Sequence, residues 1–258
     1  MNTAILCASL LAGLWIPGAA NDKPASKDPK PIRVLMITGA DVKAHPWRET
    51  TPALRDDLEM ANTDDRNPGD KFAVYVSEEP LVLESAAALE AYDVILLNYY
   101  NFERASLTPK AKENLLAFVS GGKGLVCFHF SVRAFDDWPE YRNLVGRIWV
   151  PGKSGHGPRG KFKVRIKDTR HPITRGLTGF EADDELYAKL EGKAPIHVLV
   201  EADSAWSGKT EPLAWTLDYG KGRVFALMLG HDVAACRSVH FITLLQRGTQ
   251  WVARREAR

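Results

Sequence analysis

Apolar runs alternate with amphipathic segments along the chain from Ile32 onward. Short apolar runs rich in β-branched residues are typical of strands, and the nearly continuous ones are typical of strands covered on both faces. We expect strands at residues 32–39, 71–76, 93–100, 124–130, 161–166 and 197–202. Two more are predicted within residues 212–229, where a glycine-containing turn indicates an antiparallel hairpin.

Helices are predicted between several of these strands. One is expected to begin at the Thr-Pro pair 51–52, a second to run from the Thr-Pro pair 108–109 to Gly121, and the last to begin near Ser238. Alternation of strands and helices predicts an α/β fold, a doubly wound and mostly parallel sheet with helices on both faces and one antiparallel hairpin. No linker interrupts the pattern, so residues 32–258 are expected to form one domain.

The N-terminal segment has a different pattern. Residues 4–16 are apolar, Pro17-Gly18 breaks the run, and small residues lead to Ala20. This predicts a secretory signal at residues 1–20 with cleavage after Ala20, and hence a periplasmic or secreted protein; an uncleaved N-terminal anchor is the alternative. Residues 21–31 are charged and proline-rich, which indicates a flexible tether.

Composition and charge exclude some classes of partner. The 258 residues include 34 basic and 32 acidic side chains, a net charge of +2, which gives no electrostatic case for binding nucleic acid or an anionic membrane. After residue 20, no apolar run approaches the roughly 20 residues that span a bilayer. The sequence does not decide the oligomeric state, and a homodimer is compatible with it.

Polar side chains follow the ends of the predicted strands. In an open α/β sheet, ligands bind outside the carboxyl ends of the strands, so these positions are expected to line one cleft. A single histidine there is more often a hydrogen-bonded structural residue, but several at one edge favour a functional site. The candidates are His45, Trp47, Asn98, Tyr99, His129, Trp138, His231 and Asp232 after strands, with His156 and Glu185 in two further loops.

Two familiar chemistries can be compared with this set. Acyl transfer requires a nucleophile in the tight turn after a central strand, but His129 occupies that position and Cys127 lies two residues earlier, in the strand. Metal binding needs about three converging ligands, which His129, His156, His231 and Glu185 could supply, although without a short diagnostic spacing. No glycine-rich phosphate loop of the P-loop kind is present, because GGKG precedes a strand instead of following one, so no nucleotide is expected.

Many short motifs in this order resemble the trehalose-utilisation, ThuA-like family. They are RVLMITGA, HPWRETTP, VSEEPL, YDVILLNYYN, GGKGLVCFHF, DWPEYRNLVG, HPITRGL, DELY, EPLAWTLDYGKGRVF and LGHD, spread over residues 33–251. The resemblance implies a flavodoxin-like fold similar to class I glutamine amidotransferases, with His129 in place of their catalytic cysteine. It also implies catabolism of disaccharides or glycosides, often as 3-keto sugars, and metal binding in some members. Ala40 departs from the second glycine that is common in the first loop of the family.

Two hypotheses follow. In the first, the protein is an enzyme, a hydrolase, lyase or isomerase that acts on a (3-keto-)disaccharide or glycoside by acid/base chemistry. His129, Glu185 and His231 would be catalytic, and a divalent metal, zinc before others, would be held by His129, His156 and His231. The substrate would be contacted by His45, Trp47, Asn98, Tyr99, Trp138 and Asp232. In the second, it is a non-catalytic module that binds a small sugar or another partner.

Overall fold

The computed structural model describes residues 1, 30–63, 71–101 and 103–255, and the predicted signal and tether lie almost wholly outside them. A nine-stranded sheet forms the centre of the described part, in the order β2-β1-β3-β4-β11-β10-β9-β6-β7. In chain order the strands are β1 Ile32–Ile37, β2 Phe72–Ser77, β3 Val94–Leu97, β4 Gly124–Phe128, β6 Gly160–Ile166, β7 Phe180–Asp184, β9 His197–Ser204, β10 Lys209–Tyr219 and β11 Gly222–Leu227. A separate two-stranded sheet pairs β5, Gly155–His156, with β8, Tyr187–Ala188.

The central sheet divides into a parallel and an antiparallel part. Strands β2, β1, β3, β4 and β11 pair in parallel, and all of β4 is buried, as its unbroken apolar sequence predicts. From β11 onward, β10, β9, β6 and β7 pair antiparallel, so the predicted hairpin is the beginning of a longer antiparallel extension. The prediction of a doubly wound α/β fold is confirmed.

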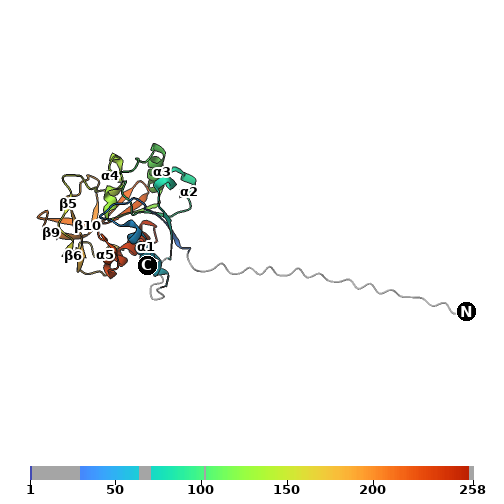
Figure 1. Cartoon of the computed structure of the whole chain (residues 1–258). Helices are drawn as coiled ribbons and strands as arrows, with labels where there is room; N and C mark the ends of the chain where they lie inside the picture. The colour runs from blue at the N-terminus through green and yellow to red at the C-terminus, as the bar shows by residue number, and fades with distance from the viewer. Residues whose placement is uncertain (2–29, 64–70, 102, 256–258) are drawn as a thin grey trace.

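Helices cover both faces of this sheet. They are α1 Trp47–Glu59, α2 Ala86–Leu89, α3 Pro109–Ser120, α4 Pro139–Val145, α5 Val233–Cys236 and α6 Val239–Val252. In Figure 1, α2, α3 and α4 lie above the sheet, and α1 and α5 lie below it. The packing agrees. Helix α4 contacts Cys127 of β4 through Tyr141, whereas Gly248 of α6 packs on Phe225 of β11. Phe225 pairs with Val126, the residue of β4 next to Cys127. Neighbouring residues of a strand face opposite sides of the sheet.

The first helix begins earlier than predicted. The Thr-Pro pair 51–52 was expected to start it, but α1 runs from Trp47 and contains Pro52 on its exposed side. The preceding turn is held by tertiary contacts that local sequence does not reveal, since the side chain of Asn98 donates hydrogen bonds to the hydroxyls of Thr50 and Thr51 at 3.2 and 3.0 Å. These bonds stabilise helical backbone ahead of the proline.

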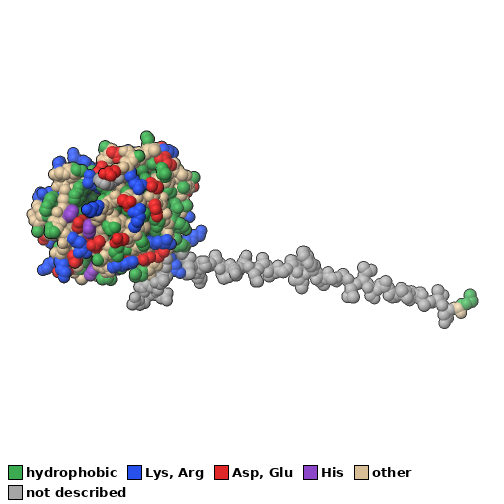
Figure 2. All heavy atoms as spheres, viewed as in Figure 1, with side chains coloured by type: hydrophobic (Ala, Val, Ile, Leu, Met, Phe, Trp, Pro, Cys, Tyr) green, Lys and Arg blue, Asp and Glu red, His purple; other side chains and the backbone are tan. Residues whose placement is uncertain are grey.

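The surface agrees with the balanced composition. On the face seen in Figure 2, basic and acidic side chains are interspersed rather than gathered by sign. Among the described residues, no helix is long and apolar enough to cross a membrane.

Replacing Gly248 with alanine is expected to destabilise the fold by about 1–3 kcal/mol. Alanine is the better helix former by roughly 1 kcal/mol, but a Cβ at this position would lie 2.2 Å from two ring carbons of Phe225, so the steric conflict decides the sign. Urea unfolding of the two proteins measures the difference. As a control, Val239→Ala at the exposed start of the same helix should change the unfolding free energy by no more than about 0.5 kcal/mol. An unchanged or raised stability of Gly248→Ala would contradict this packing of α6.

Candidate functional site

Four polar side chains converge at the carboxyl end of the sheet. His129 directly follows β4, His45 lies between β1 and α1, Glu185 directly follows β7, and His231 lies between β11 and α5. One potential ligand atom from each of these residues lies within 4.8 Å of the others. The parallel strands β1, β4 and β11 all end at this edge, which is why three histidines far apart in sequence meet there. These four residues are called the His/Glu cluster below.

Contacts within the His/Glu cluster are close. The ring of His45 lies 5.1 Å from that of His129 and 5.1 Å from that of His231, centre to centre, and the last two are 5.6 Å apart. Glu185 Oε2 lies 3.0 Å from His231 Nδ1 and 3.8 Å from His129 Nε2. The carboxylate therefore faces two of the three imidazoles.

Each imidazole of the His/Glu cluster has one buried ring nitrogen with no hydrogen-bond partner: Nδ1 of His45, Nε2 of His129 and Nδ1 of His231. His231 Nδ1 is close to Glu185 but lacks the geometry of a hydrogen bond to it. In two of the rings the other nitrogen is held, in His129 by the carbonyl oxygen of Met228 at 2.7 Å and in His45 by the hydroxyl of Tyr187 at 3.2 Å. A buried polar atom without a partner is costly, so three of them in one cluster need an explanation.

His129 has an unusual backbone conformation. Its φ of +40° is in the left-handed region, which non-glycine residues seldom adopt, and it begins the 3₁₀ helix His129–Arg133 directly after β4. The side chain is fully buried. Because a carbonyl oxygen can only accept, Nδ1 of His129 carries the proton that bonds to Met228, and Nε2 is the ring nitrogen that faces Glu185. Such strain is characteristic of functional turns.

Asp184 holds two segments of the site together. This residue is 3% exposed, and its carboxylate accepts three backbone hydrogen bonds: from Glu185 at 2.8 Å, from His231 at 3.0 Å and from Gly230 at 2.6 Å. Gly230 has a φ of +102°, and a Cβ there would lie 2.5 Å from the ring of Phe128, so the segment that carries His231 has little freedom. One buried carboxylate thus links Glu185 to His231 through the backbone.

The electrostatics of the cluster favour a neutral His45 and an ionised Glu185. Burial lowers the pKa of His45 to about 2, and the neighbouring His129 and His231 act in the same direction. Burial by itself would raise the pKa of Glu185, but His129 and His231 outweigh it and lower this pKa. Burial would likewise lower the pKa of His231, but Glu185 outweighs it and raises the pKa. Neutral imidazole and carboxylate are the forms that bind divalent metals, so His45 and Glu185 favour the binding form, whereas His231 would release its proton on binding a metal.

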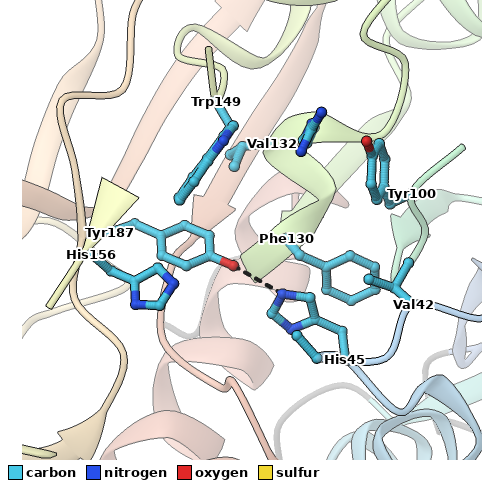
Figure 3. A pocket seen from close by; sticks show the side chains of 10 residues that line it. Val42, His45, Tyr100, Phe130, Val132, Trp149, His156 and Tyr187 are labelled. Carbon is cyan, nitrogen blue, oxygen red and sulfur yellow. Dashed lines mark hydrogen bonds between the residues drawn. The ribbon is translucent and has the colours of Figure 1, made fainter. Parts of the chain in front are cut away.

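A cavity of about 210 Å³ lies beside this cluster and is lined by one of its members, His45. Figure 3 shows His45, His156 and Tyr187 at one end of it, with Trp149 and Tyr100 on opposite sides and Phe130 beside His45. Burial raises the pKa of Tyr187 well above its ordinary value, so its hydroxyl keeps the proton. His156 Nδ1 is 2.7 Å from the carbonyl oxygen of Gly157, to which it donates, and 3.6 Å from Glu185 Oε1.

The structure places the predicted site residues in three groups. His129, His231 and Glu185 are in the His/Glu cluster, as is His45, which was predicted only to contact substrate. His156, a predicted metal ligand, lines the cavity beside the cluster instead.

The remaining five predicted residues do not line the cavity. Trp47, Asn98, Tyr99 and Trp138 are at most 8% exposed, and Asp232 caps α5 and pairs with Arg159 at 2.7 Å. Their positions do not support the substrate contacts predicted for them, because their side chains are engaged in the core or in capping.

Four aromatic residues that line the cavity were missed by the sequence analysis: Tyr100, Phe130, Trp149 and Tyr187. Tyr187 could have been predicted from the sequence, because it follows Glu185 by two positions in an extended segment, where alternate side chains share a face. Phe130 stacks on His45 with ring centres 4.5 Å apart, but nothing in the local sequence pairs the two.

A model of the trehalose utilisation family, ThuA, matches residues 33–252. The chain belongs to this family. The family predicted from the motifs is therefore confirmed, and its description links ThuA proteins to trehalose utilisation. No match was found among curated proteins.

Solved structures include ThuA-like relatives. A ThuA-like protein from Parabacteroides merdae ATCC 43184 is 27% identical with a TM-score of 0.75, covering 88% of this chain and 92% of that one. Another from Bacteroides uniformis ATCC 8492 is 20% identical with a TM-score of 0.62, covering 89% and 94%. A β-galactosidase from Bacillus circulans sp. alkalophilus is 14% identical with a TM-score of 0.55, and the match covers 88% of this chain but 32% of that enzyme. The last two similarities concern the fold alone.

Proposed function

We propose that this ThuA protein is a metal-dependent enzyme that acts on a keto-sugar, with the divalent ion held by His45, His129, His231 and Glu185. The observation that carries the proposal is the set of three buried imidazole nitrogens without hydrogen-bond partners, one in each histidine of the His/Glu cluster. A bound cation would satisfy all three. Three imidazoles and a carboxylate suit zinc and other first-row divalent ions, of which zinc is our first choice.

The surroundings of the ligands fit such a site. Metal-bound histidines usually donate a hydrogen bond from the other ring nitrogen, which fixes their orientation. His129 does so to the carbonyl of Met228, and Nε2 of His45 is placed to do so to the hydroxyl of Tyr187. Asp184 fixes the backbone of the remaining two ligands.

His156 is the candidate acid/base. It lines the cavity next to the ligands without being one of them, and the carbonyl of Gly157 orients its ring through Nδ1. The opposite nitrogen, Nε2, then has a lone pair for proton transfer. This revises the predicted roles, since His129, His231 and Glu185 would act as ligands and His156 as the group that moves a proton.

The reaction class follows from the chemistry of a keto group. A ketone on the ring makes the neighbouring C–H acidic, and a bound divalent ion would stabilise negative charge on the ketone oxygen. His156 would take the proton from this carbon. If the bond to the glycosidic oxygen then breaks, the leaving oxygen takes up a proton and the result is elimination; if a proton returns to the opposite face of the carbon, the result is epimerisation.

The test combines metal analysis with isotope exchange. The full chain, saturated with zinc, would be incubated with 3-keto-trehalose in D₂O and followed by NMR. We expect one zinc per chain, deuterium at the carbon next to the ketone, and loss of both exchange and product after chelation. His156→Gln should keep its zinc and lose about 10²–10⁴ in rate. Binding of trehalose or its keto form with neither exchange nor turnover would instead favour the non-catalytic sugar-binding module.

A further inference from the structure

We propose that the cavity above the His/Glu cluster holds one uncharged sugar ring between Trp149 and Tyr100, so that a disaccharide enters only by its terminal ring. The inference rests on the proposed function and specifies the substrate of the same site. It follows from the size of the cavity, its walls, its charge and the position of the reactive groups.

Size limits the occupant. The cavity of about 210 Å³ is smaller than the ~300–1,000 Å³ of sites that enclose drug-sized ligands. A disaccharide is a ligand of that size, whereas a single sugar ring is smaller. One ring fits inside, and the second must remain outside the mouth.

The side walls are aromatic. Figure 3 shows Trp149 and Tyr100 on opposite sides of the cavity, above the end formed by His45, His156 and Tyr187. Both side chains are half-buried, and each is held by a neighbour: Trp149 packs against Tyr187 at 5.0 Å, and the guanidinium of Arg133 lies 4.8 Å from the centre of the Tyr100 ring. Flat aromatic faces match the C–H faces of a pyranose ring.

Charge selects a neutral ligand. Arg133 is the one lysine or arginine among the described residues lining the cavity, and none of these residues is acidic. The guanidinium of Arg133 is paired through Nε with Asp136 Oδ2 at 2.7 Å, so the carboxylate offsets its charge. A phosphorylated sugar would need a cation that is not already paired, because phosphate recognition relies on charge-assisted hydrogen bonds. The lining therefore favours a sugar without a phosphate or carboxylate group.

The reactive groups lie at the end of the cavity formed by His45, His156 and Tyr187. His156 and Tyr187 present polar atoms there, and Glu185 is 3.6 Å beyond the His156 ring. The ring inside the cavity is thus the one that reacts, and a second ring makes few contacts. Affinity is expected to depend on the terminal ring and hardly on chain length.

Calorimetry on the metal-free full chain tests this without turnover, using 3-keto-glucose, 3-keto-trehalose and 3-keto-glucose 6-phosphate. We expect the first two to bind within about threefold of each other, and the phosphate to bind at least about tenfold more weakly. Trp149→Ala and Tyr100→Ala should each weaken binding by roughly 3- to 10-fold. Tyr75→Ala, at an exposed tyrosine on β2 outside the cavity, is the matched control and should change nothing.

The outcomes separate this inference from the proposed function. Binding of 3-keto-trehalose more than about 30-fold tighter than 3-keto-glucose, preference for the phosphate, or full affinity in both aromatic variants would overturn the single-ring site while leaving a sugar enzyme intact. Failure of every sugar to bind the metal-free chain would overturn the single-ring site, and failure to bind the zinc-saturated chain as well would overturn both proposals.

Discussion

Replacing His129 with alanine is expected to empty the metal site, lowering zinc affinity by more than about 100-fold, with turnover of a keto-sugar lost in parallel. The variant removes one of three imidazoles and opens the cluster at its most buried position. Loss of a ligand differs from loss of a general base, because bound metal and rate fall together. Zinc per chain by elemental analysis and the rate of deuterium exchange would be measured on the same samples.

A matched control distinguishes the loss of a metal ligand from the loss of a histidine elsewhere in the protein. His197→Ala removes a histidine that is 55% exposed and pairs with Asp168 at 3.0 Å, outside the cluster. It should retain full zinc and rate. Glu185→Gln keeps the shape of the side chain but removes its charge, and it should lose zinc like His129→Ala. Because this change is isosteric, loss of zinc in it would not be explained by a folding defect. Full zinc content in both cluster variants would show that the histidines bind no metal.

Replacing Asp184 with alanine is expected to cost about 3–5 kcal/mol of folding free energy, the largest effect on stability foreseen for this protein. The substitution leaves three backbone N–H groups, those of Glu185, Gly230 and His231, without their acceptor. Each buried donor left unsatisfied costs roughly 1–3 kcal/mol, although the three costs are not fully additive. Urea unfolding, monitored by tryptophan fluorescence, measures the loss.

The neighbouring residue supplies the control. Asp183 has a side chain that is 51% exposed and pairs with Arg159, so Asp183→Ala should cost no more than about 1 kcal/mol. Asp184→Asn keeps one acceptor oxygen and should be intermediate in stability, with zinc bound roughly 10- to 100-fold more weakly because the backbone of two ligands loosens. A stability of Asp184→Ala equal to that of Asp183→Ala would mean that Asp184 does not join the two segments.

Local sequence was sufficient for the strands that form the parallel part of the sheet. The runs at 93–100 and 124–130 are short and largely apolar, which is typical of strands buried on both faces. It was also sufficient to place His129 and His231 at one edge, because residues that follow parallel strands share that edge whatever the details of packing. The predicted start of α1 was wrong because hydrogen bonds from Asn98, distant in sequence, extend the helix toward its N-terminus.

The aromatic contacts could not be assigned in this way. Trp138 and Trp149 both lie outside the predicted strands and helices, but Trp138 packs against Tyr141 in the core, whereas Trp149 lines the cavity. Similarly, Tyr99 is buried and the next residue, Tyr100, lines the cavity. An aromatic side chain is suited to either environment, and the choice depends on which segments pack around it.

The sequence by itself determined the family, the strands of the parallel part of the sheet, and the edge of the sheet where His129 and His231 lie, but it did not predict β7 or the short helices α2, α4 and α5. Only the tertiary structure decided that His45 completes the cluster while His156 lines the cavity, and that Asp184 accepts from Gly230, 46 residues away in the chain. The reason is physical. Periodicity records which face of an element is buried, a local property, whereas the partner of a buried polar atom is set by loops that bring distant segments within about 3 Å of one another.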